Sequence, residues 1–202
     1  MEYRNFKKGF TLVEVLVSIS ILVLLMSISF ANFGKADQSE LLRYGARRLA
    51  DSLQSAQSFA QSGTLADYPT AQSYGVHTDV ASQLITLYAD RDTTSGLGRW
   101  DEGKDAPMQE RLSYIVRPGR EILLDSIKVY RNVDDQTPFV VSSVDIAAVP
   151  PNARLIVPGL TDTAGNEVVA IHRVVFTIKQ IATGKTADVV VSMLSGRIDV
   201  GY

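Results

Sequence analysis

Hydrophobic and polar positions follow three patterns along the chain, and the first is an apolar run from Phe10 to Phe33. These 24 residues would extend roughly 36 Å as a helix, enough to cross the ~30 Å hydrocarbon layer of a membrane. The run carries one charged residue, Glu14, a short distance from its start. An ionised side chain is costly inside a bilayer, so a glutamate in a predicted membrane helix indicates a specific role.

The second pattern lies between Gly34 and Gly63, where apolar residues recur at alternating steps of four and three. This spacing predicts an amphipathic helix whose inner stripe packs on a sheet; the stripe comprises Leu42, Ala46, Leu49, Leu53, Ala56 and Ala60. Arg43, Arg47 and Asp51 follow a neighbouring face, which we expect to be solvated, with contact to neighbouring subunits as the functional alternative. Gly63 is the predicted C-cap. Together, the two segments predict one helix of about 50 residues.

The third pattern starts near Tyr74, where short runs rich in β-branched and aromatic residues alternate with loops of Gly, Pro, Asp and Thr. Strands are expected at 74–78, 83–90, 111–116, 121–131, 139–149, 153–157, 168–181 and 187–194, with 195–200 as a last edge strand. Residues 182–185 predict a hairpin turn. Because no helix-length periodic segment intervenes, the sheet should be mostly antiparallel. The predicted fold class is α+β, with a long N-terminal helix packed on an antiparallel β-sheet domain.

Composition narrows the possible chemistry. The chain of 202 residues has a formal net charge of −2, which gives no general attraction to nucleic acid or acidic lipid. It contains no cysteine, so disulfides, thiolate metal sites and a cysteine nucleophile are excluded. We find no internal repeat and no second globular domain.

The residues before the apolar run predict its orientation and a processing site. Arg4, Lys7 and Lys8 precede it, and the positive-inside rule then keeps the N-terminus in the cytoplasm. Cleavage after the flexible Gly9 would give Phe10 a new amine, with Glu14 one helical turn away as its partner. An ordinary secretory signal is the alternative, but it would need a shorter apolar core followed by a small-x-small cleavage site.

The stretch KKGFTLVEVLV, with its basic leader, Gly9, Phe10 and Glu14, resembles the type IV prepilin family, which includes the pseudopilins of type II secretion. The resemblance implies that a prepilin peptidase cuts after Gly9 and that Phe10 is N-methylated. It also implies that Glu14 pairs with the Phe10 amine of an adjacent subunit. The expected parts are a leader (1–9), a membrane or filament-core helix (10–33), its soluble continuation (34–63) and a β-rich domain (64–202).

The family resemblance implies a non-catalytic, minor subunit of a type IV pilus or a secretion pseudopilus, inserted once in the inner membrane before assembly. Its partners would be the peptidase, other pilin subunits, the assembly platform and membrane lipid. The stretch RRLADSLQSAQSFAQS further resembles the minor pseudopilins that include the GspH and FimT proteins. Many pilins carry a proline in the second half of the first helix, and this run has none. The alternatives are a ligand-binding pilin, for adhesion or DNA uptake, and a single-pass anchored domain.

Two sequence patterns that resemble enzyme motifs are better explained as ordinary strand and turn residues. Gly184 and Lys185 resemble part of a phosphate-binding loop, but Lys179 stands where that motif needs a glycine. The two histidines, His77 and His172, lie far apart in strand-like runs, so we expect satisfied strand residues and not a zinc pair. We therefore expect no enzymatic activity and no required cofactor.

The loop DRDTTSGLGRWDEGKD carries hard oxygen donors of the kind that calcium prefers, and these are Asp90, Asp92, Thr94, Asp101 and Glu102. Its spacing departs from a calcium-binding loop, because serine stands at the glycine position and aspartate at the last ligand position. A solvated acidic turn and a calcium site therefore both remain open. Trp100 would anchor this loop on the core or form a surface contact.

The end of the chain, SGRIDVGY, raises nucleic-acid binding. In the FimT-like proteins a Gly-Arg-x-Arg motif resembles a phosphate-binding strand, and Gly196 and Arg197 match its first half. Asp199 replaces the second arginine, and its carboxylate would repel phosphate. Arg197 is thus a weak candidate contact, and we do not expect nucleic acid as a partner.

Overall fold

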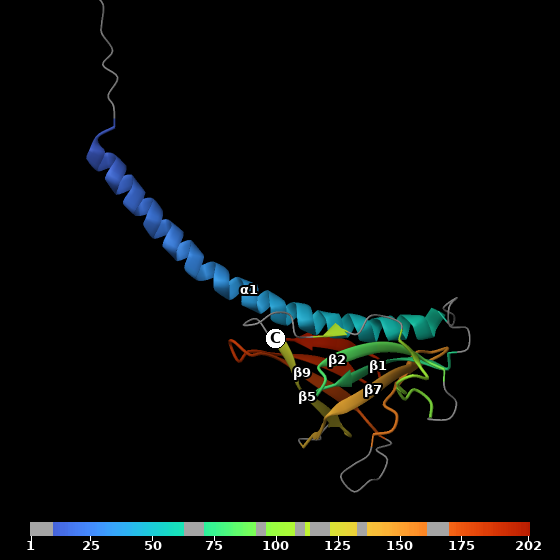
Figure 1. The fold of residues 1–202 in the computed structure, drawn as a ribbon. Helices are drawn as coiled ribbons and strands as arrows, with labels where there is room; N and C mark the ends of the chain where they lie inside the picture. The colour runs from blue at the N-terminus through green and yellow to red at the C-terminus, as the bar shows by residue number, and fades with distance from the viewer. Residues whose placement is uncertain are drawn as a thin grey trace, which may run out of the picture. The chain divides into compact units, whose positions relative to one another are not determined.

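The computed structural model describes residues 10–62, 71–91, 96–107, 112–113, 122–132, 137–160 and 170–202, without the side chains of 30–39 and 112–113. One helix, α1 (Leu12–Ser62), precedes the strands (Figure 1). The described strands are β1 (Ser73–Asp79), β2 (Leu84–Asp90), β3 (Ala106–Pro107), β4 (Leu112–Ser113), β5 (Ile122–Tyr130), β6 (Phe139–Val141), β7 (Ser143–Val149), β8 (Arg154–Ile156), β9 (Arg173–Gln180), β10 (Thr186–Ser192) and β11 (Ile198–Gly201). The α+β fold class is confirmed.

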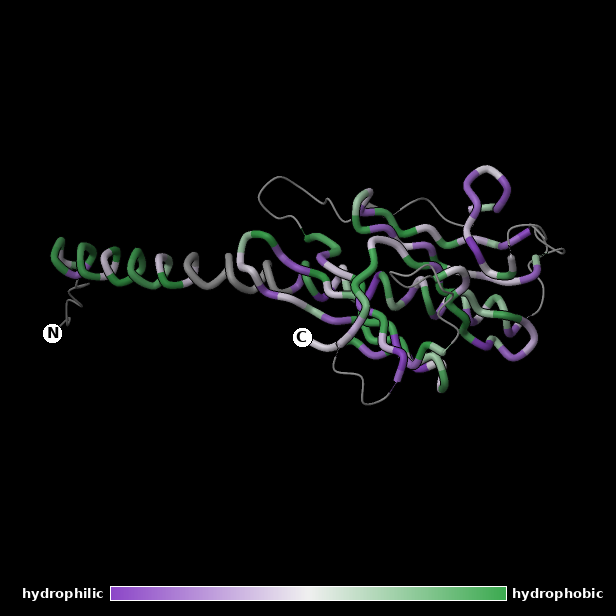
Figure 2. Tube along the Cα trace, turned by 90° about the horizontal axis from the view of Figure 1, so that it is seen from below, coloured by the Kyte–Doolittle hydropathy of each residue, from purple (hydrophilic) through white to green (hydrophobic). Residues whose placement is uncertain are grey.

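Helix α1 is continuous over 51 residues, which confirms the prediction of one long helix. The chain divides into two compact units, Met1–Glu40 and Leu41–Tyr202. In the first unit, Leu12–Ser29 has a mean hydropathy of 2.5 and none of it is buried, so its length and composition suit a membrane crossing. Figure 2 shows the hydrophobic colour dominating this stretch. Gly63, the predicted C-cap, lies outside the described residues.

In the second unit, the predicted inner stripe of α1 is confirmed. Leu42, Ala46, Leu49, Leu53, Ala56 and Ala60 are all buried. Arg43, Arg47 and Asp51 are exposed, as expected for a solvated face. Gly45, Ala50 and Ser52 are buried as well, so the covered face is wider than the stripe alone.

All described strand pairs are antiparallel, as predicted, but they form two sheets. The first, sheet A, has the order β3-β2-β1-β7-β8, with β4 also paired to β2. The second, sheet B, has the order β11-β10-β9-β5-β6. The expected strand 139–149 is really two strands, β6 in sheet B and β7 in sheet A, separated by Ser142. Period-two alternation predicts which face of a strand is buried but not which neighbour it pairs with, so this crossover was missed.

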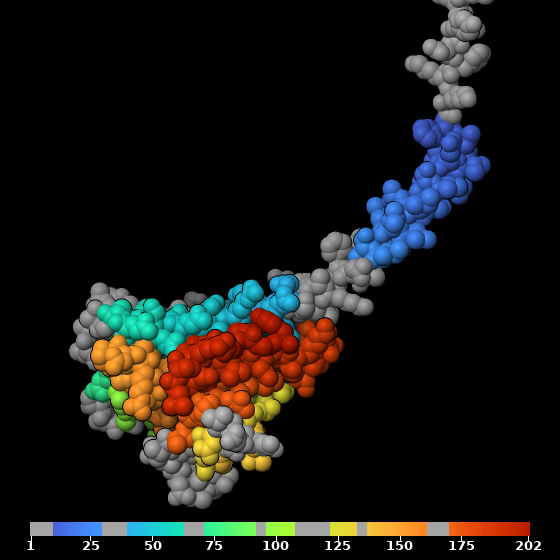
Figure 3. Space-filling model, turned by 180° about the vertical axis from the view of Figure 1, so that it is seen from behind, coloured from blue at the N-terminus to red at the C-terminus, as the bar shows by residue number. Residues whose placement is uncertain are grey.

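A single hydrophobic core joins the two sheets to the second half of α1. Its members include Leu49 from the helix, Ile146 from sheet A and Phe176 from sheet B. The C-terminal strands, in red, lie beside this half of α1 (Figure 3), where Gln57 Nε2 donates a 2.7 Å hydrogen bond to the carbonyl of Gly196. The predicted hairpin turn joins β9 to β10, and β11 is an edge strand as expected.

Several strands differ from the prediction in their presence or extent, and three of these differences matter most. Strand β3 was not expected, because two residues show no periodicity. Strand β9 begins at Arg173 and not at 168, and residues 170–172 before it are irregular. Of the expected strand 111–116, the structure describes only β4.

Candidate functional sites

The first candidate site is the start of α1, where Thr11 and Glu14 form a capping box. The amide of Glu14 donates to Thr11 Oγ1 at 3.2 Å. In return, Glu14 Oε2 accepts hydrogen bonds from the amide of Thr11 at 3.2 Å and from its hydroxyl at 3.1 Å. The carboxylate is therefore held at the positive end of the helix dipole.

This cap places the carboxylate of Glu14 at the amide of Thr11, the residue that follows Phe10. The Phe10 side chain is 85% exposed. Glu14 Oε1 makes no hydrogen bond within the part of the chain that the structure describes, so it can accept one more. Gly9, the predicted cleavage residue, lies outside that part. The carboxylate of Glu14 is therefore positioned to pair with an amine, and within the described residues its hydrogen bonds are to Thr11 alone.

The polar side chains further along the helix are bonded to the helix itself. The hydroxyl groups of Ser18, Ser20, Ser27 and Ser29 donate to the carbonyls of Glu14, Leu16, Leu24 and Leu25 at 2.7–3.1 Å. A serine bonded in this way leaves no unsatisfied donor to face lipid. The four serines thus leave the segment suited to a membrane.

Together these features define a class of protein. It is an α+β protein whose membrane-capable N-terminal helix begins with a capping box that contains a glutamate. Residues 4–30 match the family model of the prokaryotic N-terminal methylation motif. The chain therefore carries the motif of a type IV pilin-like or pseudopilin-like precursor, and the resemblance noted in the sequence is confirmed at this level. No significant match was found among curated proteins or among solved structures.

The matched motif includes the start of α1. It implies processing by a prepilin peptidase and assembly with other pilins, and it suggests a structural subunit. With the apolar helix near the chain start, it also fits anchoring in the inner membrane.

The second candidate site is a loop, residues 96–105, which we call the strap because it crosses the outer face of sheet A. Buried Asp90 holds it, since Asp90 Oδ2 accepts from the amide of Gly98 at 2.6 Å and from the hydroxyl of Ser73 at 3.1 Å. The buried hydroxyl of Tyr88 donates to the carbonyl of Gly98. Burial raises the pKa of Tyr88 well above its usual value, with the nearby charges of Asp145, Asp90 and Asp105 adding to the effect. Tyr88 therefore remains a hydrogen-bond donor.

Asp105 closes the other end of the strap. Its carboxylate accepts from the amide of Arg91 at 3.1 Å and from the amide of Asp101 at 2.7 Å. Burial raises the pKa of Asp105 from its ordinary value, and the charges of Asp90 and Asp101 raise it further, against the lowering effect of these two hydrogen bonds. The acidic residues at the two ends of this loop thus bind its backbone.

The structure leaves the calcium prediction untested. Asp92 and Thr94 lie outside the described residues, and the described residues contain no group of three or more His, Asp or Glu that could hold a metal ion. Asp90 is committed to Gly98 and Ser73, while Asp101 lies 3.4 Å from Lys104 Nζ. Calcium binding would therefore have to act on a loop whose carboxylates already carry structural bonds.

The strap forms a pocket with the outer face of sheet A. His77 on β1 faces Asp145 on β7, and its Nδ1 lies 2.6 Å from Asp145 Oδ1. Asp145 Oδ2 accepts from the amide of Trp100 at 3.2 Å. The Trp100 ring stacks against His77 at 6.2 Å and packs on Tyr88 at 5.1 Å. Trp100 therefore anchors the strap, one of its two predicted roles.

The two remaining sequence candidates lie elsewhere. His172 precedes β9 and donates its amide to the carbonyl of Tyr130, away from His77. Exposed Arg197 donates from Nε to Asp199 Oδ1 at 2.8 Å, so the aspartate that replaces the second arginine pairs with it and offsets its charge.

Sequence reasoning missed one residue of the first site and the grouping of three residues in the second. Thr11 could have been found, since Thr-x-x-Glu before an apolar run is the pattern of a capping box. The grouping of His77, Asp145 and Trp100 had no local signal, because it depends on the pairing of β1 with β7 and on the path of the strap.

Proposed function

We propose that this protein is a structural, minor subunit of a type IV pilus or of a type II secretion pseudopilus. A prepilin peptidase cuts the precursor after Gly9, and the new N-terminus at Phe10 is methylated. The observation that carries the proposal is the match of residues 4–30 to the methylation motif, in register with the helix start at Thr11 and Glu14.

In this function the apolar half of α1 lies in the bilayer before assembly, with its N-terminus on the cytoplasmic side. On assembly, its exposed side chains exchange lipid for the corresponding helices of other subunits. The capping box holds Glu14 at the helix start, where its carboxylate would pair with the Phe10 amine of a neighbour. A charge pair in an apolar surrounding requires good geometry, so it specifies register more than it adds stability.

The first experiment is mass spectrometry of the full chain produced together with a prepilin peptidase. The expected product begins at N-methylated Phe10, and a Gly9→Val variant should remain uncut. An intact chain from Met1, or cleavage after the apolar run, would instead leave a single-pass anchored or secreted domain.

The second experiment separates the charge of Glu14 from its capping role. Glu14→Gln keeps an acceptor for the Thr11 amide but removes the charge, whereas Thr11→Ala removes the cap and keeps the charge. Loss of filament incorporation in Glu14→Gln, with membrane insertion unchanged, is the expected result. Asp188→Asn, at an exposed position of β10, is the matched control. If Glu14→Gln assembles normally, the pairing hypothesis is wrong.

A further inference from the structure

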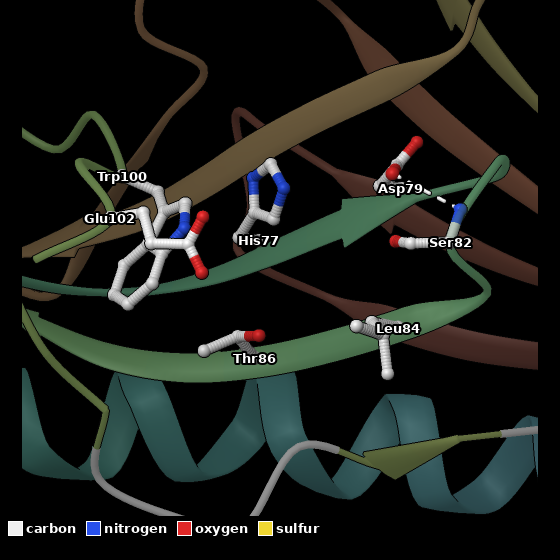
Figure 4. A pocket seen from close by; sticks show the side chains of 7 residues that line it. All are labelled: His77, Asp79, Ser82, Leu84, Thr86, Trp100 and Glu102. Atoms are coloured by element: carbon white, nitrogen blue, oxygen red, sulfur yellow. Dashed lines mark hydrogen bonds between the residues drawn. The ribbon is translucent and has the colours of Figure 1, made fainter.

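A pocket of about 200 Å³ lies between the strap and the outer face of sheet A (Figure 4). Its lining comes from β1, β2, the turn between them and the strap, and comprises His77, Asp79, Ser82, Leu84, Thr86, Trp100 and Glu102. The capped helix start and the methylation motif lie outside this part of the chain, so nothing in the proposed function uses the pocket.

One wall of the pocket is aromatic and already in place. Trp100 is held through its backbone amide by Asp145 and through its ring by Tyr88 and His77. His77 is held in turn, because Asp145 occupies its Nδ1. A ligand that stacks on Trp100 therefore meets a pre-organised surface and need not order it.

The polar part of the lining is acidic. Asp79 accepts hydrogen bonds from the amides of Ala81 and Ser82 at 3.0 and 3.1 Å. Desolvation raises the pKa of Asp79, but the bonds from Ser82 and Ala81 outweigh it and keep the pKa below its ordinary value. Asp79 thus stays ionised at neutral pH. Glu102 adds a second carboxylate at the strap, and the described lining contains no lysine or arginine.

An indole ring near one carboxylate, in a pocket with a second carboxylate at its other end, is a combination that attracts organic cations. The negative face of a tryptophan ring favours a cation above it, and guanidinium groups also stack on such rings. Thr86 and Ser82 supply hydroxyl oxygens that accept hydrogen bonds, and Leu84 offers an apolar contact for an alkyl stem.

We propose that this pocket binds a guanidinium or alkylammonium group, stacked on Trp100 beside the carboxylate of Glu102, with the carboxylate of Asp79 at the other end of the pocket adding to its negative charge (Figure 4). The group comes either from an arginine or lysine side chain of a partner protein or from a small free amine.

The test uses the fluorescence of Trp100, which is the sole tryptophan of the chain and therefore reports on the pocket alone. The full chain in a nonionic detergent is titrated with N-acetylargininamide. Its neutral counterpart N-acetylglutaminamide and the sugar N-acetylglucosamine are titrated in parallel. We expect a saturable change with a millimolar Kd for the arginine compound alone. Binding of the neutral compound with equal affinity, or of the sugar alone, would overturn the proposal.

Two variants keep the reporter and remove one charge each. Glu102→Gln should weaken binding about two- to fivefold, the range for one partly exposed ion pair, and the more distant Asp79→Asn should weaken it less. Asp51→Asn, which removes an exposed carboxylate of α1, should leave the affinity unchanged. Because Asp79 also holds a turn, melting curves must show that its variant is folded, and Glu102→Gln decides the question if it is not. Unchanged affinity in Glu102→Gln would contradict the assignment.

A final comparison identifies the source of the cation. An Ala-Arg-Ala peptide with blocked ends is titrated against agmatine, a free amine. Tighter binding of the peptide supports a partner side chain, and tighter binding of agmatine supports a small amine. If neither changes the fluorescence of Trp100 in a saturable way, the pocket is not a cation site.

Discussion

Asp145 shows how much one carboxylate can organise in this protein. One oxygen holds the imidazole of His77, and the other holds the backbone of Trp100. A strand of sheet A, a neighbouring strand and the strap are thereby joined at one residue. Asp90 and Asp105 bind the strap in the same way, through backbone amides. Hydrogen bonds to a charged group are among the stronger ones, so these three residues determine where the strap lies.

Two of the acidic residues should affect stability in opposite directions as pH changes. The pKa of Asp105 is raised in the folded protein, so its contribution to stability is greatest below its ordinary value of 3.8 and is lost as pH rises through the raised pKa. The pKa of Asp79 is lowered, so its contribution is present above 3.8 and is lost as pH falls through the lowered pKa.

The measurement is the free energy of unfolding of wild type, Asp105→Asn and Asp79→Asn against pH in calcium-free buffer. As pH falls from neutral towards 3.8, wild type should gain stability relative to Asp105→Asn. Below 3.8 it should lose stability relative to Asp79→Asn. Parallel curves for all three proteins would show that neither pKa differs between the folded and unfolded states.

Gly98 is a second residue whose substitution has a definite expected result. It has φ +81°, and an added Cβ would lie 2.7 Å from the Cβ of Ala147. Gly103 in the same strap has φ +90° but open space around it. Both changes to alanine should cost about 1–2 kcal/mol for the backbone conformation, and Gly98→Ala should cost more because it also lifts the strap. Equal melting temperatures for the two variants would contradict the packing at Gly98.

At the scale of elements, one side-chain amide links the two sheets through hydrogen bonds to backbone groups. Gln83, in the turn between β1 and β2, accepts from the amide of Leu124 at 2.8 Å and donates to its carbonyl at 3.0 Å. Leu124 stands where the pairing of β5 with β9 shifts register. The amide of Gln83 therefore satisfies backbone groups at an irregularity of sheet B.

Gln83→Met should lower the free energy of unfolding by about 1–3 kcal/mol, because it keeps the length of the side chain but leaves both groups of Leu124 without this partner. Gln54→Met, on the exposed face of α1, is the matched control and should change stability little. Thermal or denaturant unfolding distinguishes the two. A neutral effect of Gln83→Met would mean that water replaces the amide at the bulge.

The calcium prediction for the loop also belongs to this scale. Added millimolar calcium should raise the melting temperature, and Asp92→Ala should abolish the rise. Asp92 is a better choice than Asp90, because Asp90 already holds Gly98 and Ser73, and its loss would weaken the strap without any metal. The absence of a shift in wild type would leave the loop as a structural element held by its own carboxylates.

At the scale of the whole molecule, burial is unevenly distributed. The buried hydrophobic core begins at Leu42 and continues to Met193, whereas the span Leu12–Ser29 is entirely unburied. Its apolar side chains, such as Leu16 and Leu24, are exposed and add nothing to the described core.

A fragment of residues 41–202 should therefore be soluble without detergent and melt at the temperature of the full chain. A fragment of residues 54–202 lacks the buried residues Leu42, Ala46, Leu49 and Leu53. It should fail to fold, since truncating even one buried leucine to alanine costs about 2–5 kcal/mol. Circular dichroism and melting curves compare the fragments. A marked loss of stability in the longer fragment would mean that the first forty residues support the domain.

Much of this architecture could be predicted from local patterns. The stripe from Leu42 to Ala60, the hairpin turn after β9 and the edge strand at Ile198 follow from periodicity and turn residues, which are local properties. The division into two sheets could not be predicted. Strands β6 and β7 are separated by Ser142 alone, and nothing local in that sequence says that they join different partners.

The sequence by itself determined the N-terminal motif and the apolar part of α1, because the motif from Arg4 to Phe30 is contiguous and its chemistry is local to one segment. The tertiary structure alone decided the second site. His77, Asp145 and Trp100 are separated along the chain, and only the pairing of β1 with β7 and the hydrogen bonds of the strap bring them together. A linear pattern encodes what neighbours in sequence do, whereas a pocket between strands depends on contacts that form only when the chain has folded.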